Sequence, residues 1–373
     1  MTNNKDKKVL NVPNLRFPEF TGEWMKCKFG EIATGFDYGM NAAAKPYDGQ
    51  NKYIRITDID EASSTYNNSS IVSPDGILSE NYVVNEGDIL LARTGASTGK
   101  SYLYRKSDGK LYYAGFLIRA NVAEHNPYFV FSQLHTYRYW RWVSIMSARS
   151  GQPGINSLEY ASFPIFTTTL KEENKISSLL SLIDERITTQ NKIIEDLKKL
   201  KSAISERFFT SINGDVVTLA DICDIVKGKQ VNGEFLTDSG NYYVMNGGIE
   251  PSGYYDDYNT EANTISISEG GNSCGYVQFN TTPFWSGGHC YTIQNITNNV
   301  EKLYLYHYLK CNEDTIMKLR IGSGLPNIQK KDLAKFRVIV PIIEQQKTIS
   351  AFLSLLERKV QVETDLGTIK YFV

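Results

Sequence analysis

The sequence has few of the residues from which metal and redox sites are built. Its five cysteines form no Cys-x-x-Cys pair and are odd in number, which indicates reduced thiols of a cytoplasmic protein. They stand at positions 27, 223, 274, 290 and 311. The four histidines, at positions 125, 135, 289 and 307, have no spacing typical of metal ligands. We therefore expect no zinc or other metal site in the chain.

Long apolar segments and an excess of one charge are also missing. No run of 18 apolar residues is present, so we expect no membrane-spanning helix. The polar opening Met1–Lys8 is unlike a signal peptide. The net charge of −1 gives no overall support for nucleic-acid binding, so any basic surface must be local. The 24 tyrosines fit either recognition surfaces or the edges of ordinary β-rich cores.

What the sequence does contain is one unit written twice. The stretch Ser150–Asn156 returns 173 residues later as Ser323–Gln329, and the alignment of the two segments continues beyond these stretches without a gap. Counted from Ser150 to Arg186, 37 aligned positions hold 11 identities, where unrelated sequences would give roughly 2. This spacing is far too long for a solenoid, whose repeats run roughly 20–50 residues. The chain is therefore a tandem duplication of a whole domain and the segment that follows it.

The segment after the first domain predicts a long helix. Residues 20–168 alternate short apolar runs with turn residues, and runs such as Tyr53–Ile56 and Asp88–Ala92 resemble strands. Residues 171–209 then contain neither Gly nor Pro, and their apolar residues recur at steps of three and four. About 38 helical residues would reach roughly 57 Å. Such a helix serves as a coiled-coil partner or as a spacer.

The second unit repeats this order. Residues 215–342 are rich in strands and turns, with Thr264–Ser268 corresponding to the strand that ends at Ala92, and residues 344–370 form a second amphipathic helix. We expect a mixed α/β (α+β) chain with two globular domains and two long antiparallel helices in a coiled coil, related by a pseudo-two-fold internal repeat. The alternative is that each helix packs separately on its own domain. The boundaries are a lead-in at 1–19, domains at 20–168 and 211–342, and helices at 169–210 and 343–373.

Two motifs resemble catalytic loops without meeting their requirements. Gly95–Ser101 has three residues between its glycines, where a phosphate-binding loop needs four, and a strand-like run follows it instead of a helix. Asn126–Phe129 resembles the Asn-Pro-Pro-aromatic loop of amino-methyltransferases, but the chain lacks a convincing glycine-rich turn for S-adenosylmethionine. Helix initiation with Pro127 in the first turn explains it more simply. No Ser/His/Asp or Cys/His set can be assigned, so we expect no catalytic residues and no enzyme activity.

A duplicated domain without a catalytic set suits binding at two places, and DNA is the natural ligand. Polar and basic loop residues read base edges and hold phosphates. The candidates in the first domain are Lys45, Arg93, Thr94, Ser97, Lys100, Arg149, Ser150 and Gln152. The candidates in the second domain are Lys227, Lys229, Gln230, Asn232, Asn272, Ser273, Arg320, Ser323 and Asn327.

Four stretches of the chain resemble the DNA specificity subunits of type I restriction-modification systems, which serve in bacterial defence. Asn14–Phe20 followed by Trp24 resembles the opening of that family, and Glu86–Gly95 resembles the signature of its target-recognition domains. Ser323–Ile328 resembles the turn that closes such a domain. Pro341–Ile349 resembles the start of a spacer helix, as does Glu172–Ile176.

The resemblance implies that each domain is a target-recognition domain for one half of an asymmetric bipartite DNA site. The helices would set the spacer and dock two modification subunits; their partner-binding residues would be Ile176, Leu180, Ile183, Ile187, Ile194, Leu197, Ile349, Leu353 and Leu356. S-adenosylmethionine, ATP and Mg would belong to the modification and restriction subunits, and this chain would hold no cofactor. The second helix is about ten residues shorter than the first, which departs from the pattern.

Two other functions stay open on the sequence. The chain could be a coiled-coil adaptor whose two heads bind proteins, an interpretation that the net charge of −1 favours. A nucleotide-dependent enzyme built on Gly95–Ser101 would have to bind ATP through Lys100.

Overall fold

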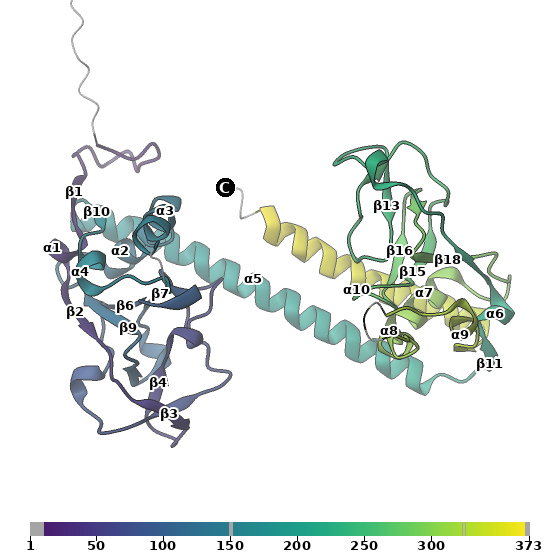
Figure 1. Ribbon diagram of the computed structural model, residues 1–373, viewed down its shortest axis with the longest axis horizontal. Helices are drawn as coiled ribbons and strands as arrows, with labels where there is room; N and C mark the ends of the chain where they lie inside the picture. The colour runs from purple at the N-terminus through teal and green to yellow at the C-terminus, as the bar shows by residue number, and fades with distance from the viewer. Residues whose placement is uncertain (1–10, 149–151, 323, 325, 370–373) are drawn as a thin grey trace, which may run out of the picture. The chain divides into compact units, whose positions relative to one another are not determined.

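The computed structural model describes residues 11–148, 152–322, 324 and 326–369, and it divides into two compact units, Met1–Thr188 and Thr189–Val373 (Figure 1). Helix α5 (Leu170–Ser211) contributes its first part to unit 1 and its remainder to unit 2. The helix expected at 169–210 is therefore present, displaced by one residue. None of the helices within the described ranges is both long and apolar enough to cross a membrane.

Unit 1 is built around an antiparallel sheet with the strand order β2 (Thr34–Tyr38), β9 (Leu117–Asn121), β6 (Asp88–Ala92) and β7 (Ser101–Leu103). Shorter strands form pairs: β1 (Met25–Lys28) with β10 (Pro164–Thr167), β3 (Ala43–Pro46) with β5 (Val72–Asp75), and β4 (Lys52–Ile54) with β8 (Leu111–Tyr113). Its helices before α5 are α1 (Phe29–Ile32), α2 (Pro127–Gln133), α3 (Tyr137–Met146) and α4 (Ser157–Ala161), with short 3-10 turns at Ile56–Asp58, Glu80–Tyr82, Gly95–Ser97 and Lys106–Asp108. The strands expected near residues 53–56 and 88–92 are thus β4 and β6, although β4 ends at Ile54.

Strand β6 lies at the centre of unit 1 because both of its faces are apolar. Ile89 and Leu91 belong to one buried cluster, with Ile118 and Phe163, while Leu90 and Ala92 belong to a second. Every residue of β6 is buried. A continuous apolar run, rather than an alternating one, is what a strand covered on both faces requires. This strand leads directly into the loop that carries Arg93.

Unit 2 repeats the plan of unit 1. Its sheet has the order β12 (Asp224–Lys227), β18 (Cys290–Gln294), β15 (Thr264–Ser268) and β16 (Val277–Asn280), which corresponds strand by strand to the sheet of unit 1. Strand β11 (Asp215–Thr218) pairs with β19 (Arg337–Val340), and β13 (Tyr242–Met245) pairs with β14 (Tyr254–Tyr255) and β17 (Trp285–Ser286). The helices are α6 (Leu219–Ile222), α7 (Lys302–Cys311), α8 (Glu313–Met317), α9 (Lys330–Ala334) and α10 (Ile343–Ile369), with a 3-10 turn at Gly233–Phe235. The duplication inferred from sequence is therefore a duplication of fold.

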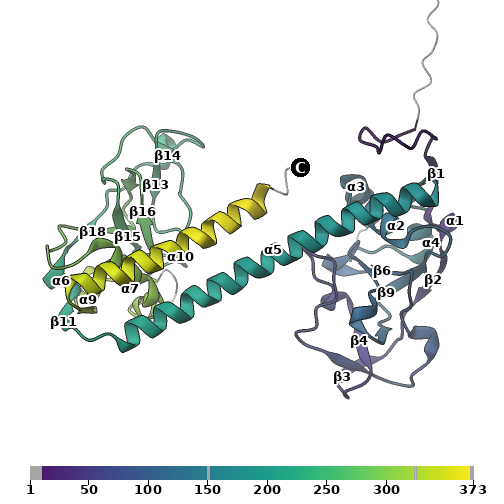
Figure 2. The ribbon, with the colours of Figure 1, turned by 180° about the vertical axis from the view of Figure 1, so that it is seen from behind.

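Within unit 2, the C-terminal part of α5 and α10 run antiparallel (Figures 1 and 2). Their contacts proceed in opposite directions along the two helices: Phe208 with Phe352 at 5.9 Å between ring centroids, Lys201 Nζ with Glu357 Oε1 at 2.6 Å, and Gln190 Nε2 with Glu363 Oε2 at 2.6 Å. The predicted antiparallel helix pair is confirmed.

Helix α10 also packs on its own domain, which corrects part of the predicted partner-binding set. Leu353 is fully buried and Ile349 is 8% exposed, and both belong to the core cluster that contains Leu305 and Leu309 of α7. Apolar residues at these two positions stabilise unit 2 and are not available to a partner. The alternative of separate packing therefore describes the first turns of α10, and helix pairing describes the remainder.

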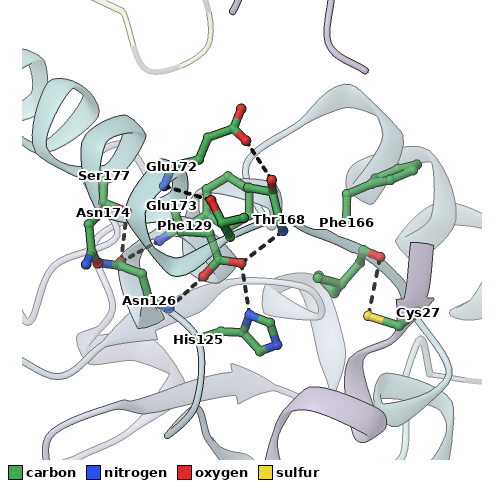
Figure 3. Close-up of polar contacts among 12 residues, drawn as sticks. Cys27, His125, Asn126, Phe129, Phe166, Thr168, Glu172, Glu173, Asn174 and Ser177 are labelled. Carbon is green, nitrogen blue, oxygen red and sulfur yellow. Dashed lines mark hydrogen bonds and ion pairs between the residues drawn. The ribbon is translucent and has the colours of Figure 1, made fainter. Parts of the chain in front are cut away.

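The first turn of α5 is anchored in unit 1 by two buried carboxylates (Figure 3). Glu172 accepts hydrogen bonds from Arg16 Nε (2.6 Å) and Nη2 (2.7 Å), and from Trp24 Nε1 (3.1 Å). Glu173, which is fully buried, accepts from the backbone N–H groups of Asn126 (2.9 Å) and Thr168 (3.2 Å). Carboxylates near a helix N-terminus are stabilised by the helix dipole. These bonds fix the direction in which α5 leaves the domain.

Asn126 is a helix cap, as its sequence context predicts. It precedes α2, its side-chain oxygen accepts a hydrogen bond from Phe129 N (3.0 Å), and Pro127 occupies the first helical position. In unit 2 the cap of α7 is Glu301, whose N–H donates to Gln346 Oε1 (2.8 Å) just as Asn126 N–H donates to Glu173. The Asn-Pro pair therefore serves helix initiation.

The loops after the central strands β6 and β15 have the same backbone geometry. We name Arg93–Gly99 and Glu269–Gly275 the corner loops, and Pro153–Ile155 and Pro326–Ile328 the closing segments. Six backbone hydrogen bonds, each from an N–H to a C=O, have equivalents in both units. In unit 1 they run from Arg93 to Phe116, Gly95 to Pro153, Thr98 to Gly95, Gly99 to Ala92, Lys100 to Ser97 and Ile155 to Arg93. In unit 2, in the same order, they run from Glu269 to His289, Gly271 to Pro326, Cys274 to Gly271, Gly275 to Ser268, Tyr276 to Ser273 and Ile328 to Glu269. Each corner loop is thus closed at the same points.

This geometry also removes the basis for a nucleotide site at Gly95–Ser101. A phosphate-binding loop must open a helix, so that backbone N–H groups converge on the phosphate. Here the loop makes a single 3-10 turn, Gly95–Ser97, and continues into strand β7. A tight turn between strands is what the structure has.

Substituting the glycine that ends a corner loop should unfold unit 1 more easily. Gly99 has φ +94°, and a Cβ there would lie 2.7 Å from Val143 Cγ1 and 2.9 Å from Trp140 Cζ3. We expect Gly99→Ala to lower the free energy of unfolding by about 2–5 kcal/mol, since a left-handed backbone and an overpacked core both cost energy. Gly22→Ala, which meets nothing within 4 Å, should change it by less than about 0.5 kcal/mol. Equal losses in thermal or urea unfolding would contradict the geometry.

Stability should fall in acid partly through His307, which is 3% exposed on α7 and lies 3.0 Å from Ser354 Oγ on α10. Burial lowers the pKa of His307 to about 4. The folded state therefore resists protonation, and stability present above pH 6.5 is lost as the pH falls from 6.5 to about 4, by up to roughly 3 kcal/mol. In urea unfolding across that range, His307→Gln should flatten the loss. Thr348→Ala, at an exposed residue of α10, removes no titrating group and should keep the loss; the same pH profile for both variants would refute the assignment.

Candidate nucleic-acid interface

In unit 1 the corner loop presents a cation against an aromatic ring. The Arg93 guanidinium lies 4.7 Å from the centroid of the Tyr38 ring, a cation–π geometry, and its Nη1 is 3.5 Å from Gly115 O. The Tyr38 hydroxyl accepts a hydrogen bond from Ser157 N (3.3 Å), and this bonding to Ser157 lowers the pKa of Tyr38. Phe116, next to these groups through the backbone bond from Arg93, is 58% exposed. The corner is therefore a cationic group with apolar surface beside it.

In unit 2 the equivalent corner has a carboxylate at its centre. Glu269 Oε1 accepts hydrogen bonds from Lys227 Nζ (2.7 Å) and from the Tyr291 hydroxyl (2.9 Å). Its Oε2 lies 3.6 Å from His289 Nδ1 and has no hydrogen-bond partner among the described residues. The glutamate side chain is 10% exposed, whereas those of Lys227 and His289 are 53% and 63% exposed. Burial and the hydrogen bond to Glu269 raise the pKa of Tyr291.

The corner loops and closing segments bring together many of the residues predicted to contact DNA. Thr94 pairs with Gly154 as an isolated bridge, and Gln152 Nε2 lies 3.2 Å from where a Cβ on Gly95 would stand. In unit 2, Asn327 pairs with Gly270, and Gln230 Oε1 lies 2.6 Å from where a Cβ on Gly288 would stand. The residues gathered on or beside the corners are Arg93, Thr94, Ser97, Gln152, Lys227, Gln230, Asn272, Ser273 and Asn327. Whether they touch DNA stays a prediction.

Other predicted residues are engaged elsewhere. Lys45 lies on β3, in a separate two-stranded sheet, and Lys100 Nζ forms an ion pair with Glu61 (3.0 Å). Asn232 caps the turn Gly233–Phe235, while the carbonyl of Lys229 accepts from Trp285 Nε1 (2.8 Å). Arg320 is exposed, between α8 and the closing segment. Arg149, Ser150 and Ser323 lie outside the described residues.

Sequence reasoning missed Tyr38, Glu269 and His289. DNA contacts are usually made by cations and neutral polar groups, and the carboxylate of Glu269, directly after strand β15, does not fit that pattern. One signal was available: Gly95 and Gly99 have the same spacing as Gly271 and Gly275, and aligning these pairs sets Arg93 against Glu269. Both glycine pairs have positive φ, from +71° to +96°, so their spacing reflects a shared turn.

The predicted helix surface is partly exposed. On α5 in unit 1, Ile183 is 43% exposed, and its neighbours Leu179 and Leu182 are 47% and 64% exposed. Ile176, Leu180, Ile187, Ile194, Leu197 and Leu356 are half-buried. Among the described residues, no three His, Cys, Asp or Glu side chains gather where they could hold a metal ion.

Part of the chain is similar in sequence to one family of known proteins. The family model described as "Type I restriction modification DNA specificity domain" matches residues 213–368. A protein of Mycoplasma pneumoniae named as a type I specificity subunit is 32% identical over 154 residues, 41% of each chain, so the match spans less than half of that relative's length. A type I restriction enzyme specificity subunit of Methanocaldococcus jannaschii is 21% identical over 331 residues, 77% of this chain and 76% of the relative.

The fold is shared over nearly the whole chain. The crystal structure of the S subunit of a type I restriction-modification system from M. genitalium superimposes with a TM-score of 0.71, covering 94% of this chain and 93% of the other, at 18% sequence identity. The family model covers most of unit 2, and over unit 1 the likeness to this structure is one of fold. The chain is therefore similar to type I restriction-modification specificity subunits, in sequence over residues 213–368 and in fold over nearly its whole length.

Proposed function

We propose that this chain is the DNA-reading, non-catalytic subunit of a type I restriction-modification complex. Residues 20–168 and 211–342 are its target-recognition domains, and each contacts one half of an asymmetric bipartite site. The observation that carries the proposal is the pair of corner loops. They have the same backbone hydrogen bonds but different side chains, Arg93 in one and Glu269 in the other.

A fixed backbone with exchanged side chains suits sequence reading. Discrimination between bases depends on hydrogen bonds placed with an accuracy that a mobile loop does not provide. The closing segments hold both loops through Ile155 N–H and Ile328 N–H. Because the groups so held differ between the units, the two half-sites differ as well. Because the net charge is −1, contact with phosphates would be local, through exposed cationic side chains such as Lys227.

The helices supply surfaces for partner subunits. The exposed apolar residues of α5 in unit 1 (Leu179, Leu182 and Ile183) and of α10 in unit 2 (Leu355 and Leu366) remain without cover in the chain's own cores. Apolar residues on helices favour protein partners. Two modification subunits, which would carry S-adenosylmethionine, are the partners that the family implies; the restriction subunits would bring ATP and Mg.

The chain together with its modification subunit should bind one gapped DNA sequence. Neutralised phosphates should give a linear fall of log K with log salt concentration, with a slope of about −0.9 per phosphate contacted. Methylome sequencing of the host with and without the gene should show a bipartite motif that disappears on deletion.

Two results would contradict the proposal. If no gapped motif is lost on deletion, the chain does not direct methylation. If the complex with the modification subunit has no DNA affinity at low salt, the coiled-coil adaptor with two protein-binding heads becomes the better account.

A further inference from the structure

Three positions at each corner loop are equivalent between the two units. Strand registers pair Tyr38 with Ile118 and Lys227 with Tyr291, and the residues two places before these partners are Phe116 and His289. The backbone bonds Arg93 N–H to Phe116 O and Glu269 N–H to His289 O complete the match. We name Tyr38, Arg93 and Phe116 the corner triplet of unit 1, and Lys227, Glu269 and His289 the corner triplet of unit 2.

The triplet of unit 1 has its cation at the centre. Tyr38 holds the guanidinium of Arg93 by cation–π contact at 4.7 Å. The one hydrogen bond from this guanidinium to a described residue is the long contact of 3.5 Å with Gly115 O. A planar guanidinium matches the paired acceptors of guanine, N7 and O6, in the major groove. Phe116, 58% exposed, adds an apolar surface beside it.

The triplet of unit 2 has the opposite charge order. Glu269 is buried and its two oxygens face Lys227 Nζ at 2.7 Å and His289 Nδ1 at 3.6 Å, so the carboxylate lies beneath two exposed side chains. Its Oε2 has no hydrogen-bond partner among the described residues, although it is buried. A buried carboxylate oxygen gains a donor if the imidazole of His289 turns its Nδ1–H toward it. The carboxylate would then hold the exposed His289 side chain in place, as it holds Lys227.

We infer that the corner triplets determine base preference within each half-site. Arg93 reads a guanine in the half-site of unit 1, while Glu269 is a positioning residue that holds Lys227 and His289 toward the bases or phosphates contacted by unit 2. The inference rests on the proposed function, and it goes beyond it by assigning the difference between the two half-sites to three equivalent positions. Charge reversal at the central position, from Arg to Glu, is the reason that one frame would read two DNA sequences.

The test uses the full chain with its modification subunit and two kinds of variant. Arg93→Gln should lower the affinity for the wild-type sequence, relative to sequences changed at one base pair of the unit 1 half-site, by roughly 5- to 150-fold, the range of a bidentate arginine–guanine contact. Glu269→Gln keeps the size of the side chain and an acceptor for Tyr291 but removes the charge facing Lys227 and His289. It should change base preference in the unit 2 half-site alone. Ser162→Ala, at an exposed residue whose hydroxyl donates to Glu159 O (2.6 Å), lies outside the triplet and should leave both halves unchanged.

The outcomes separate this inference from the proposed function. If the wild-type complex reads no gapped motif, the function itself fails. If the wild type reads one and both variants fold, methylate and keep every base preference, the corner triplets do not determine specificity. If Glu269→Gln lowers the unfolding temperature without altering base preference, Glu269 is merely structural and its positioning role is refuted. Loss of preference confined to the expected half supports the inference, and change in both halves contradicts it.

Discussion

Backbone hydrogen bonds between each corner loop and its closing segment are the constraint on which the rest of this structure depends. Arg93 and Glu269 follow the most buried strand of their sheets, and their carbonyls accept from Ile155 and Ile328. Because only backbone groups take part, the side chains at these positions can change without loss of the frame. The backbone groups of the corner are hydrogen-bonded whatever its side chains are, so the stability of the corner does not depend on what those side chains recognise.

The two units also share hydrogen bonds but differ in side chains at the places where their helices begin. Glu173 and Gln346 each accept an N–H from the cap of a neighbouring helix, Asn126 in unit 1 and Glu301 in unit 2. Unit 1 adds the Arg16–Glu172 ion pair, whose arginine comes from the N-terminal segment and has no counterpart in the repeat. Burying paired charges is weak evidence for stability but fixes geometry. In a specificity subunit, that geometry would bear on the distance between half-sites.

Much of the fold could be predicted because its signals are local. The period of apolar residues located α5 within one residue, and the repeat at 150–156 and 323–329 located the closing segments. A short-range pattern also predicted the strand-like run that follows the Gly95–Gly99 turn, which is β7. Periodicity cannot tell which neighbour an apolar face meets, so Leu353 was assigned to a partner although α7 covers it.

The candidate site was harder to predict because it depends on strand register. Closing segments align with an offset of 173 residues and corner loops with one of 176, the difference between 269 and 93, since the intervening loops differ in length. Tyr38 and Lys227 align only through their pairing with β9 and β18. A glutamate that occupies the position equivalent to an arginine is not found by looking for basic residues. The sequence thus located the loops but missed the residues that distinguish them.

The central claim is that two equivalent frames read two different DNA sequences, and a chain with two copies of one reader tests it most directly. Residues 25–167 and 215–340 begin and end at equivalent strand pairs, Met25 with Thr167 and Asp215 with Val340, so the second can replace the first. Methylome sequencing of cells that express this chain with the modification subunit should give a motif whose two halves are the same sequence. A motif that keeps the original half-site of unit 1 would contradict the account.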